Sequence, residues 1–358
     1  MDHLPEKMKA LVAYAPGDYR LEEVDTPRAG EGEIILKVEA CGICAGDVKA
    51  YKGAVSFWGG EGNPPYIKAP MIPGHEFVGK VVEIGPGVSG WNIGDRICPE
   101  QIVPCGECMF CKTGRYWMCE KHDLFGFQYN VNGGMAEYVR LTKEAINHLI
   151  PEKMPLEKAI LVEPYSCSWH CVDKAKIGNV DVVVQSGVGT LGLGMIGAIK
   201  QKNPKLLIAL DMNDARLEKA KEFGADIVMN PGKEDVVSRI KEMTGGYGCD
   251  IYIEAAGHPS SVKQGLEMIR KMGRFVEFSV FKDMVTVDWS IISDRKELEV
   301  LGVHLSPYCY ETVIDWINSE KMKTDGVVSH KLPLEKWKEG FQIAEESKEG
   351  TFKVILMP

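Results

Sequence analysis

Four cysteines are gathered in one short segment of the chain. Cys105, Cys108, Cys111 and Cys119 lie in the sequence CGECMFCKTGRYWMC, with two residues between successive members of the first three and seven before the fourth. Four thiolates on one tight loop can close a tetrahedral zinc site, which would be structural because no coordination position stays open. An iron–sulfur cluster also takes four cysteines, but this spacing matches neither ferredoxin pattern, so zinc is the better prediction.

A second set of candidate metal ligands is spread over the first half of the chain. Cys44 lies in CGICAGD, His75 and Glu76 lie in PGHE, and Glu163 lies in VEPYSC. A thiolate, an imidazole and a carboxylate supply three protein ligands and leave a fourth position for water or substrate, which is the pattern of catalytic zinc. Asp47, three residues after Cys44, is expected either to orient the His75 ring or to cap a helix.

A glycine-rich turn provides the third chemical signal. Gly187-Val188-Gly189-Thr190-Leu191-Gly192 follows the apolar run DVVVQS and matches G-x-G-x-x-G. Glycines at these positions allow a tight turn, close approach of the backbone to a pyrophosphate and close packing of the next helix. Asp211 ends the next predicted strand, where a carboxylate accepts hydrogen bonds from both ribose hydroxyls and repels a 2′-phosphate. The combination favours NAD over NADP.

Composition limits the kinds of protein that carry these groups. The chain has 358 residues, of which 45% are hydrophobic and 26% charged, which suits two globular domains. The formal net charge is −9 without a long basic run, so nucleic acid and membrane surfaces are not expected as partners. There is no run of about 18 apolar residues and no signal-peptide core. With an odd number of cysteines, 11, we expect reduced thiols and a cytoplasmic location.

The elements that must position the candidate residues change in character along the chain. Up to about residue 160, short β-branched runs such as 34–38 and 77–84 are broken by Gly and Pro, which predicts a β-rich domain. From about residue 165, strands and helices alternate, which predicts a doubly wound parallel sheet and an α/β fold class. The predicted strands there are 181–185, 206–210, 251–255, 274–278 and 299–302, and the predicted helices are 191–200, 215–223 and 261–271. The tail of the chain is predicted to add helices at 311–318 and 334–345 and a closing strand at 353–356.

Together these motifs closely resemble the zinc-dependent medium-chain dehydrogenases, and within them the polyol dehydrogenases of the sorbitol, xylitol and threitol type. The resemblance runs from Met8 to about Leu356. Its carriers are GICAGD, PGHEFVG, GDRI, the four-cysteine segment, NGGMAEYV, VEP, the glycine-rich turn with Asp211, and SHKLPLEKW. It implies a GroES-like catalytic domain of residues 1–164 and 307–358 around a Rossmann NAD-binding domain of residues 165–306. It also implies assembly as a homodimer or homotetramer.

The resemblance implies roles for single residues as well. Cys44 and His75 would bind a catalytic zinc, and Glu76 and Glu163 would bind it directly or through water. The cysteine segment would hold a second, structural zinc in each subunit. Glu163 and the proline after it stand where ethanol-type enzymes have a cysteine, as they do in polyol and threonine dehydrogenases.

The cofactor residues follow from the same resemblance. Leu191, Asp211 and Arg216 match positions that contact NAD, although Arg216 is alternatively an ordinary exposed helix residue. His170 lies near the zinc region in the family pattern and is equally consistent with a core histidine. The implied reaction is the oxidation of a secondary hydroxyl of a polyol to a ketose, with hydride transfer to NAD.

Two departures from the family pattern bear on the substrate. Gly46 stands where the family has a Ser or Thr that relays the substrate proton, so the proton must leave by another route, such as a water held by Glu163 or Glu76. The residues 303–306 are Val-His-Leu-Ser where sorbitol dehydrogenases tend to have an Arg-Tyr pair, which argues against sorbitol.

A longer segment, residues 51–73, looks like one in erythritol and threitol dehydrogenases. Its aromatic residues Phe57, Trp58 and Tyr66 either narrow the substrate pocket for a four-carbon chain or simply pack the loop. We therefore predict a tetritol such as erythritol or threitol as the substrate.

Three other functions fit parts of the pattern. An L-threonine dehydrogenase or a simple secondary-alcohol or diol dehydrogenase shares the chemistry and differs in substrate. A zinc-free quinone reductase of the same fold would show no metal dependence and would use NADPH. A non-catalytic, zinc-stabilised binding protein would keep the cysteine segment but would not turn over a cofactor.

Overall fold

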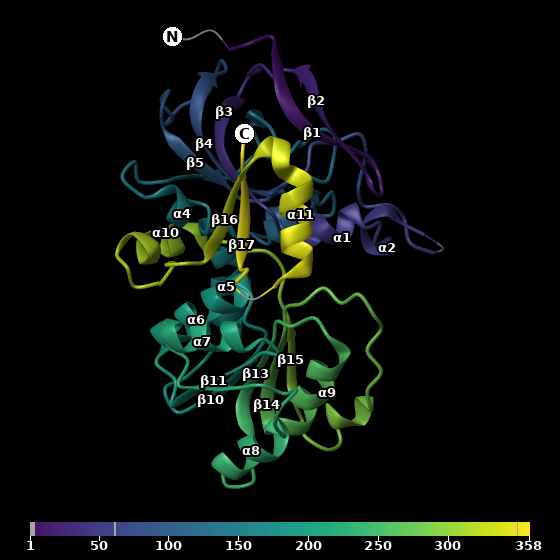
Figure 1. Ribbon diagram of the computed structural model, residues 1–358, viewed down its shortest axis with the longest axis vertical. Coiled ribbons are helices and arrows are strands. Elements are labelled where there is room, and N and C mark those ends of the chain that lie inside the picture. The colour runs from purple at the N-terminus through teal and green to yellow at the C-terminus, as the bar shows by residue number, and fades with distance from the viewer. Residues whose placement is uncertain (1–3, 61, 349) are drawn as a thin grey trace. The chain divides into compact units, whose positions relative to one another are not determined.

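The computed structural model describes residues 4–60, 62–348 and 350–358, and the chain divides into two compact units (Figure 1). The first unit ends at Glu163 and also contains the later segments Tyr310–Asn318 and Thr324–Pro358. The second unit comprises Pro164–Cys309 and Ser319–Lys323. The first unit is therefore assembled from both ends of the chain.

The first unit is built mainly of antiparallel strands. β1 (Lys7–Ala15) and β2 (Asp18–Asp25) pair with each other, and a seven-stranded sheet has the order β16-β17-β3-β4-β5-β9 with β8 on the side of β3. Its strands are β3 Ile34–Gly42, β4 Glu76–Ile84, β5 Arg96–Pro99, β8 Tyr138–Leu141, β9 Asn147–Leu149, β16 Val328–Pro333 and β17 Lys353–Met357. β6 (Ile102–Val103) and β7 (Asp123–Leu124) form a separate pair. Buried aliphatic side chains such as Leu11, Ile35 and Ile97 form the core of the first unit, as expected for strands that are rich in aliphatic residues and have one buried face.

The helices of the first unit are mostly short. They are α1 Ala45–Tyr51, α2 Val55–Trp58, α3 Met109–Lys112, α4 Leu156–Ala159, α10 Tyr310–Asn318 and α11 Trp337–Glu346, with 3₁₀ turns at Tyr116–Met118 and Leu334–Lys336. Edge-to-face ring contacts join α1 to α11, because Tyr51 lies 5.8 Å from Trp337 and 5.6 Å from Phe341 between ring centroids. The contacts hold the last residue of α1 against α11, and the residue that caps the other end of α1 is the candidate metal ligand Cys44.

The second unit contains a six-stranded parallel sheet of order β12-β11-β10-β13-β14-β15. Its strands are β10 Val182–Ser186, β11 Leu206–Leu210, β12 Ile227–Met229, β13 Cys249–Glu254, β14 Ile269–Glu277 and β15 Glu299–Gly302. Its helices are α5 Val162–Lys174, which begins at the boundary of the units, α6 Thr190–Lys202, α7 Asp214–Phe223, α8 Val236–Met243 and α9 Pro259–Met268, with a 3₁₀ turn at Trp289–Ile291. The alternation of strands and helices is the one predicted from the sequence.

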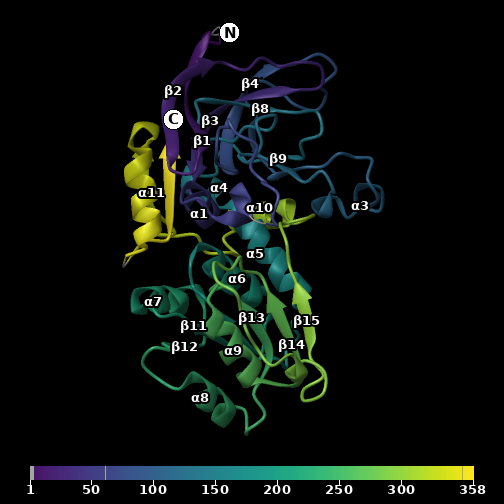
Figure 2. The same cartoon turned by 90° about the vertical axis from the view of Figure 1, so that its right-hand side faces the viewer.

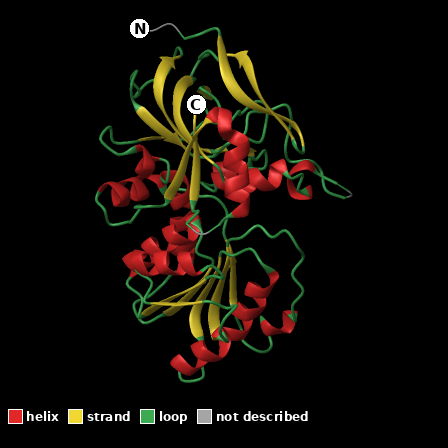
Figure 3. Ribbon diagram, in the orientation of Figure 1, coloured by secondary structure: helices red, strands yellow, loops and turns green. Residues whose placement is uncertain are grey.

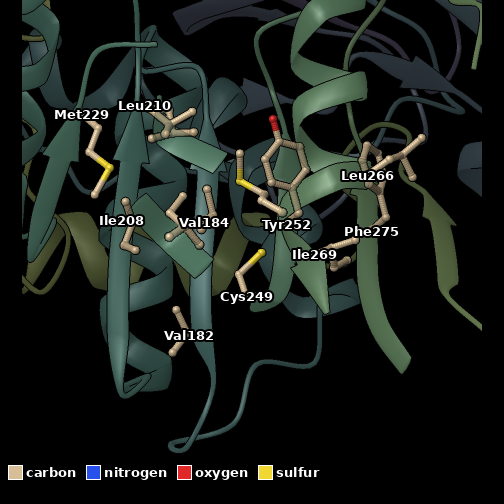
Figure 4. Close-up of a cluster of buried hydrophobic side chains, with 13 residues drawn as sticks. Val182, Val184, Ile208, Leu210, Met229, Cys249, Tyr252, Leu266, Ile269 and Phe275 are labelled. Carbon is tan, nitrogen blue, oxygen red and sulfur yellow. The ribbon is translucent and has the colours of Figure 1, made fainter. Parts of the chain in front are cut away.

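Helices cover both faces of this parallel sheet (Figures 2 and 3). From β10 the chain passes through α6 and α7 to β11 and β12 on one side of the sheet. It then passes through α8 and α9 to β13 and β14 on the other side of β10. Because both sets of crossovers are right-handed, the pair α6 and α7 and the pair α8 and α9 lie on opposite faces of the sheet. Val236 and Ile240 of α8 and Leu266 of α9 pack on Val184 and Tyr252 in one buried cluster (Figure 4). This apolar core holds the carboxyl ends of the strands, and with them the candidate cofactor loop, in fixed register.

Most predicted elements are present, but several boundaries differ. The strands Leu206–Leu210 and Glu299–Gly302 have the predicted limits, and β10 is displaced by one residue. The predicted helix 261–271 is wrong at its end, because α9 stops at Met268 and β14 begins at the next residue. The Lys296 ammonium donates to the carbonyls of Leu266 (2.6 Å) and Ile269 (2.6 Å), a distant contact that ends the helix.

One predicted helix is divided in the structure, and two elements were not predicted. The predicted helix 334–345 is divided into a 3₁₀ turn and α11, and α8 and β12 were not predicted. Among the described residues, no helix is both long and apolar enough to span a membrane.

Candidate metal centres and cofactor loop

The candidate open metal site lies where β3 and β4 are side by side. The ligand atoms of Cys44, His75 and Glu76 all lie within 4.8 Å of one another. Cys44 follows β3, and His75 precedes β4, whose first residue Glu76 is paired with Gly42 of β3. The antiparallel register therefore brings together a thiol, an imidazole and a carboxyl that are separated in the sequence.

Asp47 connects the helix cap of α1 to His75. Cys44 is the N-cap residue of α1, and its N–H donates to Asp47 Oδ2 at 2.8 Å in a capping box. The other oxygen of Asp47 lies 3.8 Å from His75 Nδ1, which is longer than a hydrogen bond. Asp47 thus caps the helix, as one of the two interpretations expected, and places a negative charge beside the imidazole without a hydrogen bond to it.

The environment of His75 favours a bound cation. Burial by itself lowers the pKa of the imidazole, but the negative charges of Asp47, Cys44 and Glu163 outweigh it and raise the pKa to about 10. His75 Nδ1 is also buried without a hydrogen-bond partner among the described residues. A set of sulfur, nitrogen and oxygen donors surrounded by negatively charged side chains fits zinc.

A buried lysine from the last strand holds Glu76. Lys353 of β17 is 4% exposed, and its ammonium donates to Glu76 Oε2 at 2.5 Å and to the carbonyl of Ile43 at 3.2 Å. The charges of Glu76 and Cys44 raise the pKa of Lys353 against the opposing effect of burial. One carboxylate oxygen of Glu76 is thus neutralised by Lys353, and the other remains available to a metal.

Glu163 lies near this group but is held by a different partner. It is in the first turn of α5 and is 2% exposed. Gln101 Nε2 donates to Glu163 Oε1 at 2.6 Å, with both side chains buried. Glu163 is not a member of the ligand group found among the described residues, although its charge acts on His75.

Two residues of this site, Lys353 and Gln101, were not identified from the sequence. Lys353 gives a weak signal, since it is a lysine beside an apolar strand, VILM, near the end of the chain. Gln101 gives none, because a glutamine after β5 has no distinguishing pattern.

An aromatic stack covers one side of the His75 ring. The rings of His75 and Phe127 are stacked with centroids 5.4 Å apart, and the rings of Phe127 and Phe57 are stacked at 5.5 Å. Trp58 Nε1–H instead donates to the carbonyl of Ala50 at 2.6 Å, and the Tyr66 hydroxyl donates to the carbonyl of His122 at 3.1 Å. Phe57 therefore points toward the metal ligands, while Trp58 anchors the loop.

The four cysteines form a second compact group. The sulfurs of Cys105, Cys108, Cys111 and Cys119 lie within 4.8 Å of one another on the loop between β6 and β7. Backbone N–H groups point at the sulfurs, as in the 3.3 Å contact from Cys105 N to Cys119 Sγ. Donors from Cys111 and Glu120 lower the pKa of Cys108 to about 6, which favours the thiolate that a metal requires.

The glycine-rich turn joins β10 to α6 as predicted. Gly187 has a φ of +100°, and a Cβ there would lie 2.5 Å from the carbonyl oxygen of Ala255, so only glycine fits. Gly189 is the N-cap residue of α6, and Leu191 lies in the first turn of the helix. Backbone N–H groups at the start of a helix are suited to a pyrophosphate.

Asp211 lies immediately after β11, beside this turn. Its carboxylate accepts hydrogen bonds from the N–H groups of Val188 (2.8 Å) and Asn213 (2.9 Å), and Arg216 Nη1 lies 4.0 Å from Asp211 Oδ2. The turn, Asp211 and Arg216 are thus brought together at the carboxyl edge of the sheet. His170, which was expected near the zinc region or in the core, is not a member of the candidate metal groups found among the described residues. Its Nδ1 lies 2.9 Å from the carbonyl oxygen of Leu305 in a buried setting, which favours the core interpretation.

Comparison with known proteins agrees with this arrangement of sites. Residues 30–152 match the family model of the alcohol dehydrogenase GroES-like domain, and residues 190–319 match that of the zinc-binding dehydrogenases. The erythritol/L-threitol dehydrogenase of Mycolicibacterium smegmatis is 48% identical over 360 residues, covering 100% of this chain and 99% of that protein. The L-threonine 3-dehydrogenase of Pyrococcus horikoshii is 35% identical, covering 99% of each chain.

Solved structures agree as well. The 2R,3R-butanediol dehydrogenase of Bacillus subtilis has a TM-score of 0.86 at 28% identity, covering 98% of this chain and 99% of that one. The β-rich unit with two thiolate-containing ligand groups and the parallel unit with a glycine-rich turn define a zinc-binding dehydrogenase. This chain belongs to the zinc-dependent medium-chain alcohol dehydrogenase family and is an enzyme of that class.

Proposed function

We propose that this enzyme oxidises a secondary hydroxyl of a short polyol, a tetritol such as erythritol or threitol, to the ketose, with NAD as the hydride acceptor. The observation that carries the proposal is the 48% identity to an erythritol/L-threitol dehydrogenase over the whole chain. The stack of Phe57 and Phe127 on His75 supports a short substrate, because two rings cover one face of a candidate metal ligand.

In this proposal Cys44, His75 and Glu76 hold the catalytic zinc, with Glu163 beside them, and the four-cysteine group holds the structural zinc. A bound zinc supplies a Lewis acid that makes the substrate hydroxyl more acidic. Lys353 holds Glu76 in a buried ion pair, and Gln101 orients Glu163. Since Gly46 has no hydroxyl, the substrate proton leaves through Glu163, or through a water held by Glu163 or Glu76.

The proposed NAD site consists of Gly187, Val188, Gly189, Leu191 and Gly192 together with Asp211 and Arg216. The preference for NAD over NADP rests on Asp211, whose carboxylate would repel a 2′-phosphate. An alcohol dehydrogenase of Escherichia coli that was crystallised with NADH has a TM-score of 0.88 to this chain, at 27% identity, and covers 99% of it. That likeness supports the use of a nicotinamide cofactor.

We further propose that the enzyme is a cytoplasmic homodimer or homotetramer, with a catalytic domain of residues 1–164 and 307–358 and an NAD-binding domain of residues 165–306. The gathering of four cysteines in one candidate metal group supports a reducing compartment, because metal-binding thiols must stay reduced. The last strand of the parallel sheet, β15, and the segment before it support self-association, because Met284, Trp289 and Val300 are 94%, 71% and 42% exposed.

The deciding experiment measures reduction of NAD by the purified enzyme with erythritol, both threitols, xylitol, sorbitol, L-threonine and butane-2,3-diol, with and without a zinc chelator. The proposal expects chelator-sensitive turnover that is fastest with a tetritol and much slower with NADP. Fastest turnover of L-threonine or of the diol would reject the polyol assignment. Turnover that survives complete removal of zinc would reject the metal-dependent mechanism.

The aromatic stack offers a test of the chain-length argument. Phe57→Ala should raise kcat/KM for xylitol relative to erythritol. Removal of the outer ring of the stack leaves space beside Phe127 into which a longer polyol can extend. Trp58→Ala is the control, since the indole is committed to the carbonyl of Ala50. An unchanged ratio of the two substrates in Phe57→Ala would exclude the ring as a determinant of substrate length.

A further inference from the structure

Two carboxyl groups lie side by side at the carboxyl ends of two neighbouring strands in the second unit. Glu254 is the last residue of β13 and Glu277 is the last residue of β14, and the parallel register pairs them directly. Glu254 has no exposed surface, and Glu277 is half-buried. Neither residue belongs to the proposed metal or cofactor groups.

The hydrogen bonds of Glu254 are unevenly distributed between its oxygens. Oε1 accepts from Ala256 N (3.0 Å), Gly257 N (3.0 Å) and the hydroxyl of Ser261 on α9 (2.5 Å). Oε2 is buried and has no hydrogen-bond partner among the groups that are described. A buried carboxylate oxygen without a donor is costly, so the geometry calls for a proton at this position.

Glu277 is placed to supply that proton. Its Oε1 accepts from Ser279 N at 2.7 Å, which leaves its other oxygen for Glu254. Two adjacent carboxyl groups in a poorly hydrated place cannot both ionise easily. Burial and the charge of Glu254 accordingly raise the pKa of Glu277 to about 8.

Two described titratable groups respond to the negative charge of Glu277, and neither of them compensates it. Cys171 of α5 and Tyr252 of β13 both feel its negative charge, and burial together with that charge raises the pKa of each. Near pH 7, Cys171 is therefore a neutral thiol and Tyr252 a neutral phenol, and neither offers a positive charge to the two carboxyl groups.

The pair is connected to the glycine-rich turn through the segment Ala255-Ala256-Gly257. Ala255 N–H donates to the carbonyl of Ser186 at 2.8 Å, immediately before the turn. A Cβ on Gly187 would lie 2.5 Å from Ala255 O and 2.7 Å from Ala256 N, so this segment is the surface on which the turn rests. Glu254 fixes the segment through the N–H groups of Ala256 and Gly257.

We propose that Glu254 and Glu277 share one proton and act as positioning residues for the cofactor loop, so that loss of the proton loosens the loop and weakens cofactor binding. The inference rests on the proposed NAD site at Gly187–Gly192. Without the proton, two adjacent carboxylates repel each other beneath the segment, and the additional negative charge lies at the edge of the sheet where an anionic cofactor would bind.

The test measures NADH affinity by fluorescence between pH 6 and pH 10 for the intact enzyme and for Glu277→Gln. The amide of the variant donates to Glu254 Oε2 at every pH and cannot titrate. The wild-type dissociation constant should rise by up to about 30-fold between pH 7 and pH 9.5, as expected for one linked proton with a pKa of about 8, and should rise much less in the variant. Glu277→Leu, which has no donor, should bind NADH more weakly than Glu277→Gln at pH 7.

A second readout uses thermal unfolding without cofactor. Because the pKa of Glu277 is raised in the folded state, wild-type stability should fall, relative to Glu277→Gln, as pH rises from about 5 to about 8, and the difference should then stay constant. Identical pH dependence of stability in the two proteins would overturn the shared proton. A difference in stability with parallel NADH profiles would overturn the positioning role. Failure of the wild type to bind NADH at any pH would instead contradict the proposed cofactor site.

Discussion

At the scale of single residues, the buried ion pair of Lys353 and Glu76 is the strongest test of how the metal ligands are held. Lys353→Met removes the positive charge and leaves the Glu76 carboxylate buried, which should lower the free energy of unfolding by about 3–5 kcal/mol. The measurement is urea unfolding of the zinc-loaded enzyme. The double variant Lys353→Met with Glu76→Gln should recover a large part of the loss, since no charge is left unpaired, and a double variant no more stable than the single one would contradict this account.

Gln101 is expected to act through Glu163. Gln101→Leu keeps the volume but removes the 2.6 Å hydrogen bond to the Glu163 carboxylate. A donor favours the charged carboxylate, so its loss should move the acidic limb of kcat/KM to higher pH and reduce kcat/KM by about tenfold. Gln201→Leu, which alters a glutamine on α6, is the control. An unshifted pH profile in Gln101→Leu would mean that the contact has no part in setting the charge of Glu163.

At the scale of elements, the turn between β10 and α6 requires glycine for two different reasons, which are backbone packing at Gly187 and access for the cofactor at Gly189. Gly187→Ala places a Cβ 2.5 Å from Ala255 O at a positive φ, so it should reduce stability by about 1–3 kcal/mol even without cofactor. Gly189→Ala meets nothing within 4 Å and should leave the melting temperature unchanged while weakening NADH binding, because the methyl group occupies the place of the approaching pyrophosphate. Equal melting temperatures for the two variants would refute this distinction.

The elements also show why the sequence predicted some features and missed others. The four-cysteine group and the glycine-rich turn are each contained in one short segment, so spacing alone was informative. Lys353 reaches Glu76 only because β17 pairs with β3, a contact across 277 positions of the chain. The end of α9 likewise depends on Lys296, about thirty residues further along. Residues whose role depends on such pairings leave no local pattern.

At the scale of the whole molecule, the chain is divided between two units with different kinds of chemistry. The first unit collects the candidate metal ligands together with Lys353, which pairs with one of them, and the second collects the candidate cofactor loop. The overall α/β class and the two-part organisation were predicted from the change in rhythm near residue 165. The hydrophobic pattern of each part is repeated over many residues, so it can be recognised in the sequence, whereas a single tertiary contact cannot.

The edge of the parallel sheet provides the last prediction. β15 is the last strand of the sheet among the described residues, and Val300 on it is 42% exposed, so its outer edge is open to a second copy of the chain. Val300→Asp would bury a charge in such an interface and should weaken self-association by about 100-fold or more. The measurement is sedimentation velocity over a range of concentrations. Val180→Asp, at a valine 73% exposed in the same unit, is the matched control and should leave assembly unchanged. If Val300→Asp sediments as the wild type does, β15 is not the contact, and self-association must use another face of the molecule.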